Sequence, residues 1–153
     1  MIAIVDYGVG NLFSLKCSLD AIGVEAVVTG DAAVLRNAEK IILPGVGAFG
    51  DAARKLRDSG LTDFIKGQAK EGKQLLGICL GMQLLLEKSY EYGEHEGLGL
   101  ISGEIRPICD VIPKELKNSP KWKGTLHWNG SELAVTAKTS LFGKKQLFCN
   151  APK

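Results

Sequence analysis

The sequence predicts an α/β protein with a doubly wound, mainly parallel sheet and an antiparallel extension in its C-terminal third. Up to residue 88, short apolar runs alternate four times with stretches of helical composition, which is typical of parallel strands joined by crossover helices. Glycine-rich turns follow several of these runs, where the chain must reverse. After about residue 97, strand-like runs follow one another without intervening helices, which indicates antiparallel strands.

The composition is that of an ordinary globular protein. The chain has 153 residues, and we expect one domain over residues 1–153 with a sizeable core. Its hydrophobic fraction of 45% and charged fraction of 24% exclude a disordered or fibrous protein. No apolar run approaches the roughly 20 residues of a membrane span, and the first residues do not form a signal peptide. We therefore expect a cytoplasmic protein with no membrane partner.

The net charge of +2 is unevenly distributed along the chain. Residues 1–112 carry an excess of acidic groups, whereas residues 113–153 carry an excess of lysines. A basic tail can indicate nucleic-acid binding. These lysines, however, are mostly scattered and no arginine accompanies them, so we predict a solvated surface and no nucleic-acid partner.

Cysteine usage argues against a metal site. Cys17, Cys79, Cys109 and Cys149 lie far apart, without a CxxC pair or a nearby histidine at ligand spacing, so no metal is expected. Most of them should be buried free thiols that pack as small hydrophobic groups. We place Cys17 in the core or half-buried, on the helix after the first strand.

The first elements follow from local signals. Residues 2–5 form an apolar run typical of a buried parallel strand. Asn11 caps the next helix, which Gly23 ends. That helix has apolar residues at helical spacing: Leu12, Leu15, Leu19 and Ile22. Residues 24–28 form the second strand, and Asp31 caps a short helix that reaches Ala38.

The remaining elements continue the alternation. Residues 41–43 form the third strand, residues 51–58 and 61–71 form helices, and residues 74–78 form the fourth strand. Residues 80–88 have helical composition. Residues 105–112, 133–137 and 146–149 are predicted as the strands of the antiparallel extension. The sequence has no internal repeat and no convincing linker.

The sharpest chemical signal is Gly-Ile-Cys-Leu-Gly at residues 77–81, between an apolar strand and a helix. It has the pattern of the nucleophile elbow, with cysteine in place of serine. The glycines allow a tight turn from which Cys79 protrudes, and the helix N-terminus favours a thiolate and a developing oxyanion. A buried cysteine in a plain turn is the alternative. Three matched positions at a strand-to-helix boundary favour the nucleophile.

A second glycine-rich loop follows the third strand, with the sequence Pro-Gly-Val-Gly-Ala-Phe-Gly at residues 44–50. Loops at the carboxyl ends of parallel strands line the ligand crevice of a doubly wound sheet. This loop can turn backbone N–H groups toward an anion and supply the oxyanion donor of an acyl-transfer site. Taken alone, a plain glycine turn explains it equally well. The turn at Gly8 and Gly10 lacks the third glycine of a dinucleotide loop, so no nucleotide cofactor is expected.

Four blocks of sequence, in order, resemble the class I glutamine amidotransferases and, among these, the glutaminase subunits of imidazole glycerol phosphate synthase. The blocks are residues 4–12, 43–50, 76–85 and 97–103. The elbow marks class I amidotransferases broadly, and the opening Asp-Tyr-Gly-x-Gly-Asn-Leu points to the histidine-pathway member. The resemblance covers residues 1 to about 106 and implies a flavodoxin-like amidotransferase fold.

The resemblance also implies an activity. Members of this family hydrolyse glutamine to glutamate and ammonia through a cysteine thioester, without a cofactor. The ammonia passes to a cyclase subunit, a (β/α)8 barrel that makes imidazole glycerol phosphate in histidine biosynthesis. The resemblance assigns the nucleophile to Cys79, the oxyanion region to Gly45, Val46, Gly47 and Leu80, glutamine binding to Gln83, and the cyclase-facing turn to Asp6 and Asn11.

The C-terminal part departs from the family pattern. The family's catalytic histidine and glutamate lie in a His-Pro-Glu motif, which this sequence lacks. His95 is expected in a polar surface loop, His127 precedes Trp-Asn without the family's flanking residues, and Asn150 stands where the family has a histidine. We therefore expect a truncated or altered C-terminal part. A pseudo-glutaminase that only binds the cyclase, and another class I amidotransferase, stay as alternatives.

Overall fold

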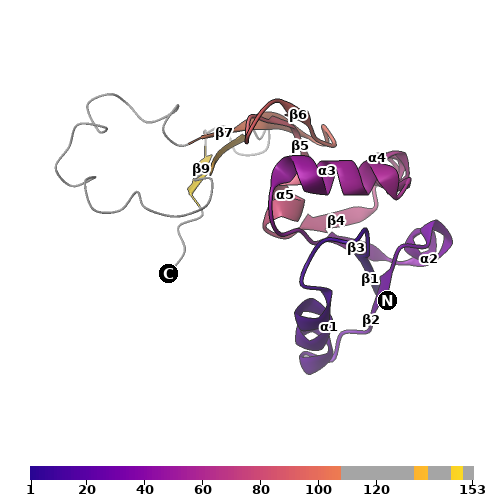
Figure 1. Ribbon diagram of the computed structural model, residues 1–153. Helices are drawn as coiled ribbons and strands as arrows, with labels where there is room; N and C mark the ends of the chain where they lie inside the picture. Colours follow the sequence, from indigo (N-terminus) through magenta and orange to yellow (C-terminus); the bar gives the residue numbers. More distant parts are fainter. Residues whose placement is uncertain (108–132, 138–145, 150–153) are drawn as a thin grey trace.

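The computed structural model describes residues 1–107, 133–137 and 146–149, the last two segments by their backbone only (Figure 1). Residues 108–112, which were predicted to continue a strand, lie outside the described residues, as do Cys109, His127 and Asn150.

Four parallel strands form the first sheet, in the order β2-β1-β3-β4. The strands are β1 (Ile2–Val5), β2 (Ala26–Thr29), β3 (Lys40–Leu43) and β4 (Gln74–Gly77). The central strands β1 and β3 are almost wholly apolar, as expected for strands covered on both faces. The predicted parallel sheet is confirmed, with strand ends shifted by one or two residues.

Helices cover the two faces of this sheet unequally. Helix α1 (Leu12–Ala21) lies on one face, and α2 (Ala32–Asn37), α3 (Phe49–Asp58) and α4 (Leu61–Lys70) lie on the other (Figure 1). Both predicted caps are confirmed. The Asn11 side chain accepts from Ser14 N at 3.2 Å, and the Asp31 side chain accepts from Ala33 N at 2.7 Å. Gly23 follows α1 with φ +71°.

The core follows the alternation of the strands. Val5, Ile41 and Leu43 point into the larger apolar cluster under α3 and α4, whereas Ile4 and Ile42 face α1. Helix α1 contributes no fully buried residue. Its Cys17 is exposed, which corrects our expectation of a buried or half-buried thiol. The reason is geometric: Leu15 and Leu19 face the sheet, and a residue two positions from each lies on the opposite side of a helix.

After β4 the chain forms a short helix, α5 (Leu80–Leu84), and then a second, mixed sheet in the order β6-β5-β7-β8-β9. Its strands are β5 (Leu86–Ser89), β6 (His95–Glu96), β7 (Ile101–Pro107), β8 (Leu133–Ala137) and β9 (Gln146–Cys149). Strands β7, β8 and β9 are antiparallel, which confirms the predicted extension. Strands β5 and β7 are parallel, a pairing that was not predicted.

The predicted helix over residues 80–88 is wrong beyond Leu84. Residues Leu86–Ser89 form β5, in which Leu86 pairs with Ile101. Leu86 and Ser89 are buried, so strand pairing and burial decide the conformation there. Helix propensities of a few tenths of a kcal/mol per residue are weak against such tertiary contacts.

Candidate active site

Three loops meet at the carboxyl ends of β1, β3 and β4. Tyr7, two residues after the end of β1, donates its hydroxyl to the carbonyl oxygen of Pro44 at 2.7 Å in a buried hydrogen bond. Ile78, directly after β4, donates its N–H to Leu43 O at 3.0 Å. The loop after β3 is therefore held between its two neighbours, at the edge where a doubly wound sheet binds ligands.

Cys79 occupies a turn with unusual backbone geometry. It lies between β4 and α5, with φ 54° and ψ −118°, and its side chain is exposed. A positive φ in a residue other than glycine is uncommon, and such strain concentrates at functional sites. A Cβ atom added at Gly77 would lie 2.5 Å from Met82 Cα, and one added at Gly81 would lie 1.9 Å from Leu43 O. Both flanking glycines are therefore required by space.

The glycine loop lies against the start of α5. A Cβ atom added at Gly45 would lie 2.6 Å from the backbone N of Gly81. Val46 is 53% exposed, and Gly47 adopts φ +87°. Within the described part of the chain, the N–H groups of Val46 and Gly47 donate to no backbone or side-chain acceptor. The loop thus presents backbone donors beside the elbow, as an oxyanion site requires.

Leu80 and Gln83 lie on α5, the helix that the elbow starts. Leu80 is buried and belongs to the larger apolar cluster. Gln83 is also buried, and its Oε1 atom has no hydrogen-bond partner among the described residues. A buried amide oxygen without a partner costs about 1–3 kcal/mol, so its retention favours a role in binding a polar group.

Asp6 and Asn11 lie in the exposed turn after β1. The Asp6 carboxylate accepts from Gly8 N at 3.1 Å, and Asn11 caps α1. Phe13, next to this turn, is 79% exposed. The turn therefore presents polar groups and one aromatic side chain to solvent.

Two residues, Glu91 and His95, lie near the site although the sequence analysis did not assign them to it. Glu91 is buried, with 4% of its surface exposed, and its Oε2 accepts from Phe49 N at 2.7 Å. His95 was expected in a surface loop, but it lies in β6, half-buried, with its ring against Gly50 and 6.4 Å from the Phe49 ring. The sequence near each residue does not indicate this position, because the contact that places it joins it to a residue more than 40 positions away.

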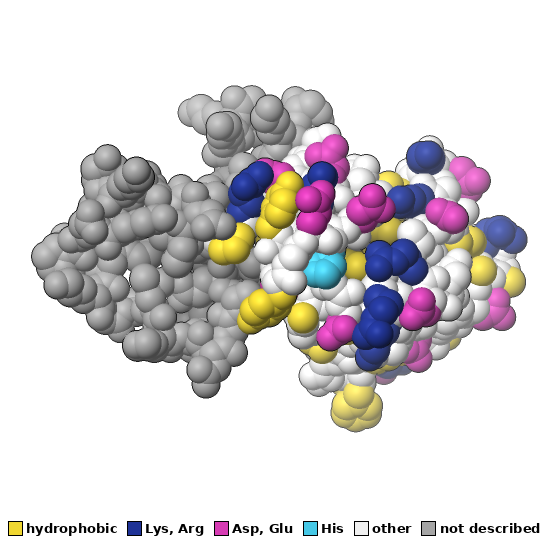
Figure 2. All heavy atoms as spheres, turned by 45° about the horizontal axis from the view of Figure 1, so that its top comes forward, with side chains coloured by type: hydrophobic (Ala, Val, Ile, Leu, Met, Phe, Trp, Pro, Cys, Tyr) yellow, Lys and Arg dark blue, Asp and Glu magenta, His cyan; other side chains and the backbone are white. Residues whose placement is uncertain are grey.

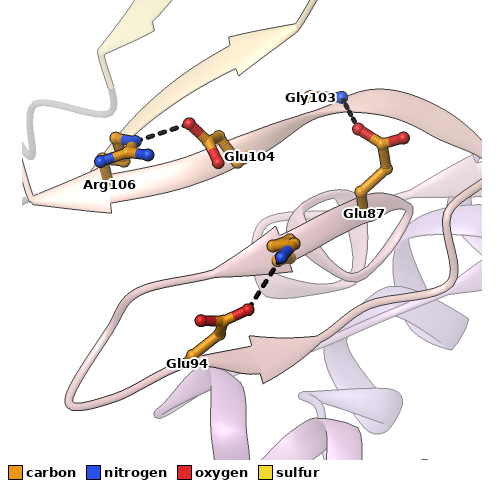
Figure 3. A network of polar contacts seen from close by, with 6 residues as sticks. Glu87, Glu94, Gly103, Glu104 and Arg106 are labelled. Atoms are coloured by element: carbon orange, nitrogen blue, oxygen red, sulfur yellow. Dashed lines mark hydrogen bonds and ion pairs between the residues drawn. The ribbon is translucent and has the colours of Figure 1, made fainter.

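The ionisable groups differ between the candidate site and the second sheet. Burial raises the pKa of the Tyr7 hydroxyl well above its ordinary value, so Tyr7 acts as a neutral hydrogen-bond donor. On the second sheet, a hydrogen bond from Arg106 lowers the pKa of Glu104, and Lys88 pairs with Glu94 at 2.8 Å (Figure 3). On the face of the molecule that Figure 2 shows, acidic and basic side chains of the described residues lie next to one another.

Other features of the described residues do not contribute to this site. No group of three or more potential ligands is placed to hold a metal ion within the described ranges. None of the helices there is long and apolar enough to cross a membrane. A surface depression of about 490 Å³ lies at the amino ends of β3 and β4, lined by Arg36, Glu39, Lys40, Gln68, Glu71, Gly72, Lys73 and Gln74. That is the opposite end of the sheet from Cys79.

Fold and elbow together define an α/β protein that presents a cysteine, at a strand-to-helix turn, beside a glycine loop with available N–H groups. Residues 3–111 match the family described as the CobB/CobQ-like glutamine amidotransferase domain. This chain therefore belongs to that family of glutamine amidotransferase domains.

Its relatives carry a more specific name. The chain is 55% identical over 105 residues to "Imidazole glycerol phosphate synthase subunit HisH" of Sulfurimonas denitrificans, which covers 69% of this chain and 51% of the relative. Proteins of the same name from Wolinella succinogenes and Aquifex aeolicus are 53% and 52% identical, over 71% and 72% of this chain and 53% and 55% of the relatives. The chain thus spans about half the length of the curated relatives it matches.

The fold has a counterpart among solved structures. A chain described as "Crystal structure of glutamine amidotransferase" superposes with a TM-score of 0.60, covering 88% of this chain and 70% of that one. At 22% identity, this likeness supports the fold and nothing finer.

Proposed function

We propose that this protein hydrolyses glutamine to glutamate and ammonia, with Cys79 as the nucleophile. The single observation that carries the proposal is the backbone of Cys79, which holds an exposed thiol on a positive-φ turn at the start of a helix. Membership in a glutamine amidotransferase family supports glutamine as the substrate. The reaction would take place in the cytoplasm.

The chemistry proceeds in two steps. The Cys79 thiolate attacks the side-chain amide carbon of glutamine, the C–N bond breaks, and the nitrogen leaves with a proton as ammonia. Water then attacks the resulting thioester, which releases glutamate and regenerates the thiol. Each attack places negative charge on the carbonyl oxygen, which backbone donors beside the thiol can stabilise.

We propose that residues around Cys79 assist this reaction. We assign the oxyanion donors to the loop Gly45, Val46 and Gly47 and to the backbone N–H of Leu80 at the N-terminus of α5. We assign glutamine binding to Gln83, because its buried Oε1 lacks a partner among the described residues. No residue of the described part is assigned as the general base.

The partner that we propose is a cyclase subunit of imidazole glycerol phosphate synthase. The relatives are named as subunits of that synthase, so they work within an assembly. Ammonia released into water is protonated and lost as a nucleophile, so a glutaminase site needs a covered exit toward its synthase. We assign the exposed turn with Asp6 and Asn11 to the docking face.

The test is glutamine hydrolysis by the protein mixed with the cyclase subunit, measured as glutamate formed. Hydrolysis that Cys79→Ser abolishes, with the variant still folded and bound to the cyclase, would support the proposal. Hydrolysis that persists in Cys79→Ser would exclude Cys79 as the nucleophile.

A pseudo-glutaminase, which would bind the cyclase without catalysis, is the alternative to be excluded. Alkylation by a glutamine-like electrophile separates the two. A catalytic site alkylates Cys79 rapidly and selectively over the exposed Cys17, whereas a binding module alkylates both thiols at similar rates.

A further inference from the structure

We propose that Glu91 is a positioning residue, which holds the Gly45–Gly47 loop in register with Cys79 by accepting a hydrogen bond at the start of α3. This inference rests on the proposed function. It assigns a role to a carboxylate that does not belong to the elbow or the glycine loop.

The first turn of α3 receives its hydrogen-bond acceptor from a distant part of the chain. Ala48 stands at the N-cap and offers no side-chain oxygen. The N–H of Phe49 donates instead to Glu91 Oε2 at 2.7 Å, across 42 residues of sequence. Phe49 is fully buried and Glu91 is 4% exposed, so water is a poor substitute for this acceptor. A negative charge at a helix N-terminus also interacts favourably with the helix dipole.

The loop before α3 is consequently held at both ends. At its start, Pro44 O accepts the Tyr7 hydroxyl, and Gly45 lies against Gly81. At its end, Phe49 is held by Glu91. Between these points, Val46 and Gly47 are exposed and carry the N–H groups that we assign as oxyanion donors. A shift of the Phe49 end would move these donors directly, because Gly47 is only two residues away.

Glu91 is itself fixed relative to Cys79. The chain runs from the elbow through α5 into β5, and the buried Ser89 hydroxyl accepts from Glu91 N at 3.1 Å. Leu98 N donates to Leu84 O at 2.7 Å, which ties the end of the hairpin to α5. The β5–β6 hairpin lies beside α3 and α5 (Figure 1). It therefore connects the nucleophile to the loop opposite it.

His95 supports the same contact from β6. A Cβ atom added at Gly50 would lie 2.6 Å from Cε1 of the His95 ring. The hairpin therefore packs closely on the first turn of α3. Glu94, on the same hairpin, is exposed and pairs with Lys88 at 2.8 Å (Figure 3). Glu94 is thus a matched control: a nearby carboxylate that pairs with Lys88 of β5.

The experiment compares two reagents that modify Cys79 by different routes. With a chloromethyl ketone of glutamine-like length, the thiolate adds to the carbonyl, forming an oxyanion, and a carbon–sulfur bond then replaces the carbon–chlorine bond as chloride leaves. With iodoacetamide, the thiolate displaces iodide directly and no oxyanion forms. Both reactions are run in buffer at about pH 9.5, because alkaline conditions favour a thiolate without help from a protein base. Mass spectrometry of the Cys79 peptide gives both rate constants.

We expect Glu91→Met, which keeps the volume and removes the acceptor, to slow the chloroketone reaction by about 10-fold to 100-fold. The iodoacetamide rate should stay within about threefold, because no oxyanion forms. Glu91→Gln keeps an acceptor, so both rate constants should stay within about threefold of those of the unmodified protein. Glu94→Ala should leave both rate constants unchanged. Glu91→Ala is a second acceptor-free variant, should the methionine variant not fold.

Several outcomes would overturn the proposal. Equal slowing of both reagents in Glu91→Met would indicate general damage to the elbow, and no slowing would remove the positioning role. If Glu91→Gln slowed the chloroketone reaction as much as Glu91→Met does, the negative charge of Glu91, and not its hydrogen bond, would be the cause. A second chloroketone without an α-amino group distinguishes positioning from contact with the substrate: a loss confined to the amino-bearing reagent would make Glu91 a ligand-binding residue. Glutamine hydrolysis is not measured here, so failure of the proposed function is detected separately.

Discussion

Gly45 lies against the backbone of Gly81, and neither position has room for a Cβ atom. One added at Gly45 would lie 2.6 Å from Gly81 N, and one added at Gly81 would lie 1.9 Å from Leu43 O. The loop after β3 and the helix after Cys79 therefore meet backbone to backbone. This contact sets the distance between Cys79 and the proposed oxyanion donors, and it can be tested by substitution.

Gly81→Ala is expected to destabilise the protein by about 1–3 kcal/mol or more, because the added methyl group overlaps the Leu43 carbonyl. Gly67→Ala is the matched control. Gly67 lies within α4, and nothing lies within 4 Å of its added Cβ, so alanine should stabilise by about 0.5–1 kcal/mol. Urea unfolding measures both changes. A Gly81→Ala variant as stable as the unmodified protein would contradict the close contact.

The backbone of Cys79 gives a second prediction. At φ 54° and ψ −118°, a residue with a Cβ atom is strained, whereas glycine adopts this conformation freely. Cys79→Gly should therefore be more stable than Cys79→Ala by about 1 kcal/mol, although glycine normally loses more chain entropy on folding. Free energies of unfolding of the two variants provide the measurement. Greater stability of Cys79→Ala would show that the turn is relaxed.

The buried Tyr7 hydroxyl leads us to expect a loss of folding stability at high pH. Burial raises its pKa in the folded state above the ordinary value of 10.0. Above about pH 10 the unfolded chain loses this proton and the folded chain keeps it, so the unfolded state is favoured as pH rises. The free energy of unfolding should fall by up to about 1.4 kcal/mol per pH unit from this group.

Tyr7→Phe isolates that contribution, because other groups titrate equally in both proteins. The variant should lose about 1 kcal/mol at pH 7, since it cannot donate to Pro44 O. The difference between the two proteins should then shrink as the pH rises above 10. A difference independent of pH would mean that the Tyr7 hydroxyl ionises as easily in the folded state as in the unfolded one.

These predictions also indicate what the sequence alone could supply. The parallel strands and the caps at Asn11 and Asp31 were predictable, because apolar runs and cap side chains act over a few residues. The elbow at Cys79 was predictable for the same reason: two glycines and a cysteine at a strand-to-helix boundary require a tight turn. The function of that turn was inferred from the residue type and the resemblance.

Long-range contacts were not predictable. Leu86 has a helical neighbourhood in sequence, and only its pairing with Ile101 makes it part of a strand. Glu91 lies in a polar stretch typical of a surface loop, yet its partner at Phe49 buries it. The contact between Gly45 and Gly81 likewise depends on the order of the strands. In each case the deciding interaction joins residues distant in sequence.

Catalysis provides a prediction about this 153-residue chain. Alone, it should hydrolyse glutamine at least about 100-fold more slowly than an amidotransferase that contains a His-Pro-Glu motif, because general acid–base assistance is worth on the order of 10²–10⁴ in rate. The sequence lacks a His-Pro-Glu motif, and His95 packs against Gly50. Glutamate release measures the rate. Full turnover that His127→Ala abolishes would show that His127 supplies the base.

The final prediction concerns docking to the cyclase barrel through the turn that contains Asp6 and Asn11. A lysine at Asn11 would place an unpaired positive charge in the proposed interface, at a cost of about 2–5 kcal/mol in binding. The substitution also removes the cap that Asn11 gives to Ser14 N. Asn11→Ser controls for this loss, because serine caps a helix as well as asparagine does. Titration calorimetry with the cyclase should show binding by the unmodified chain, a change within about threefold for Asn11→Ser, and weakening of at least about 30-fold for Asn11→Lys. Equal binding by all three proteins would place the interface on another surface, and no binding by the folded, unmodified chain would refute the docking proposal for this chain.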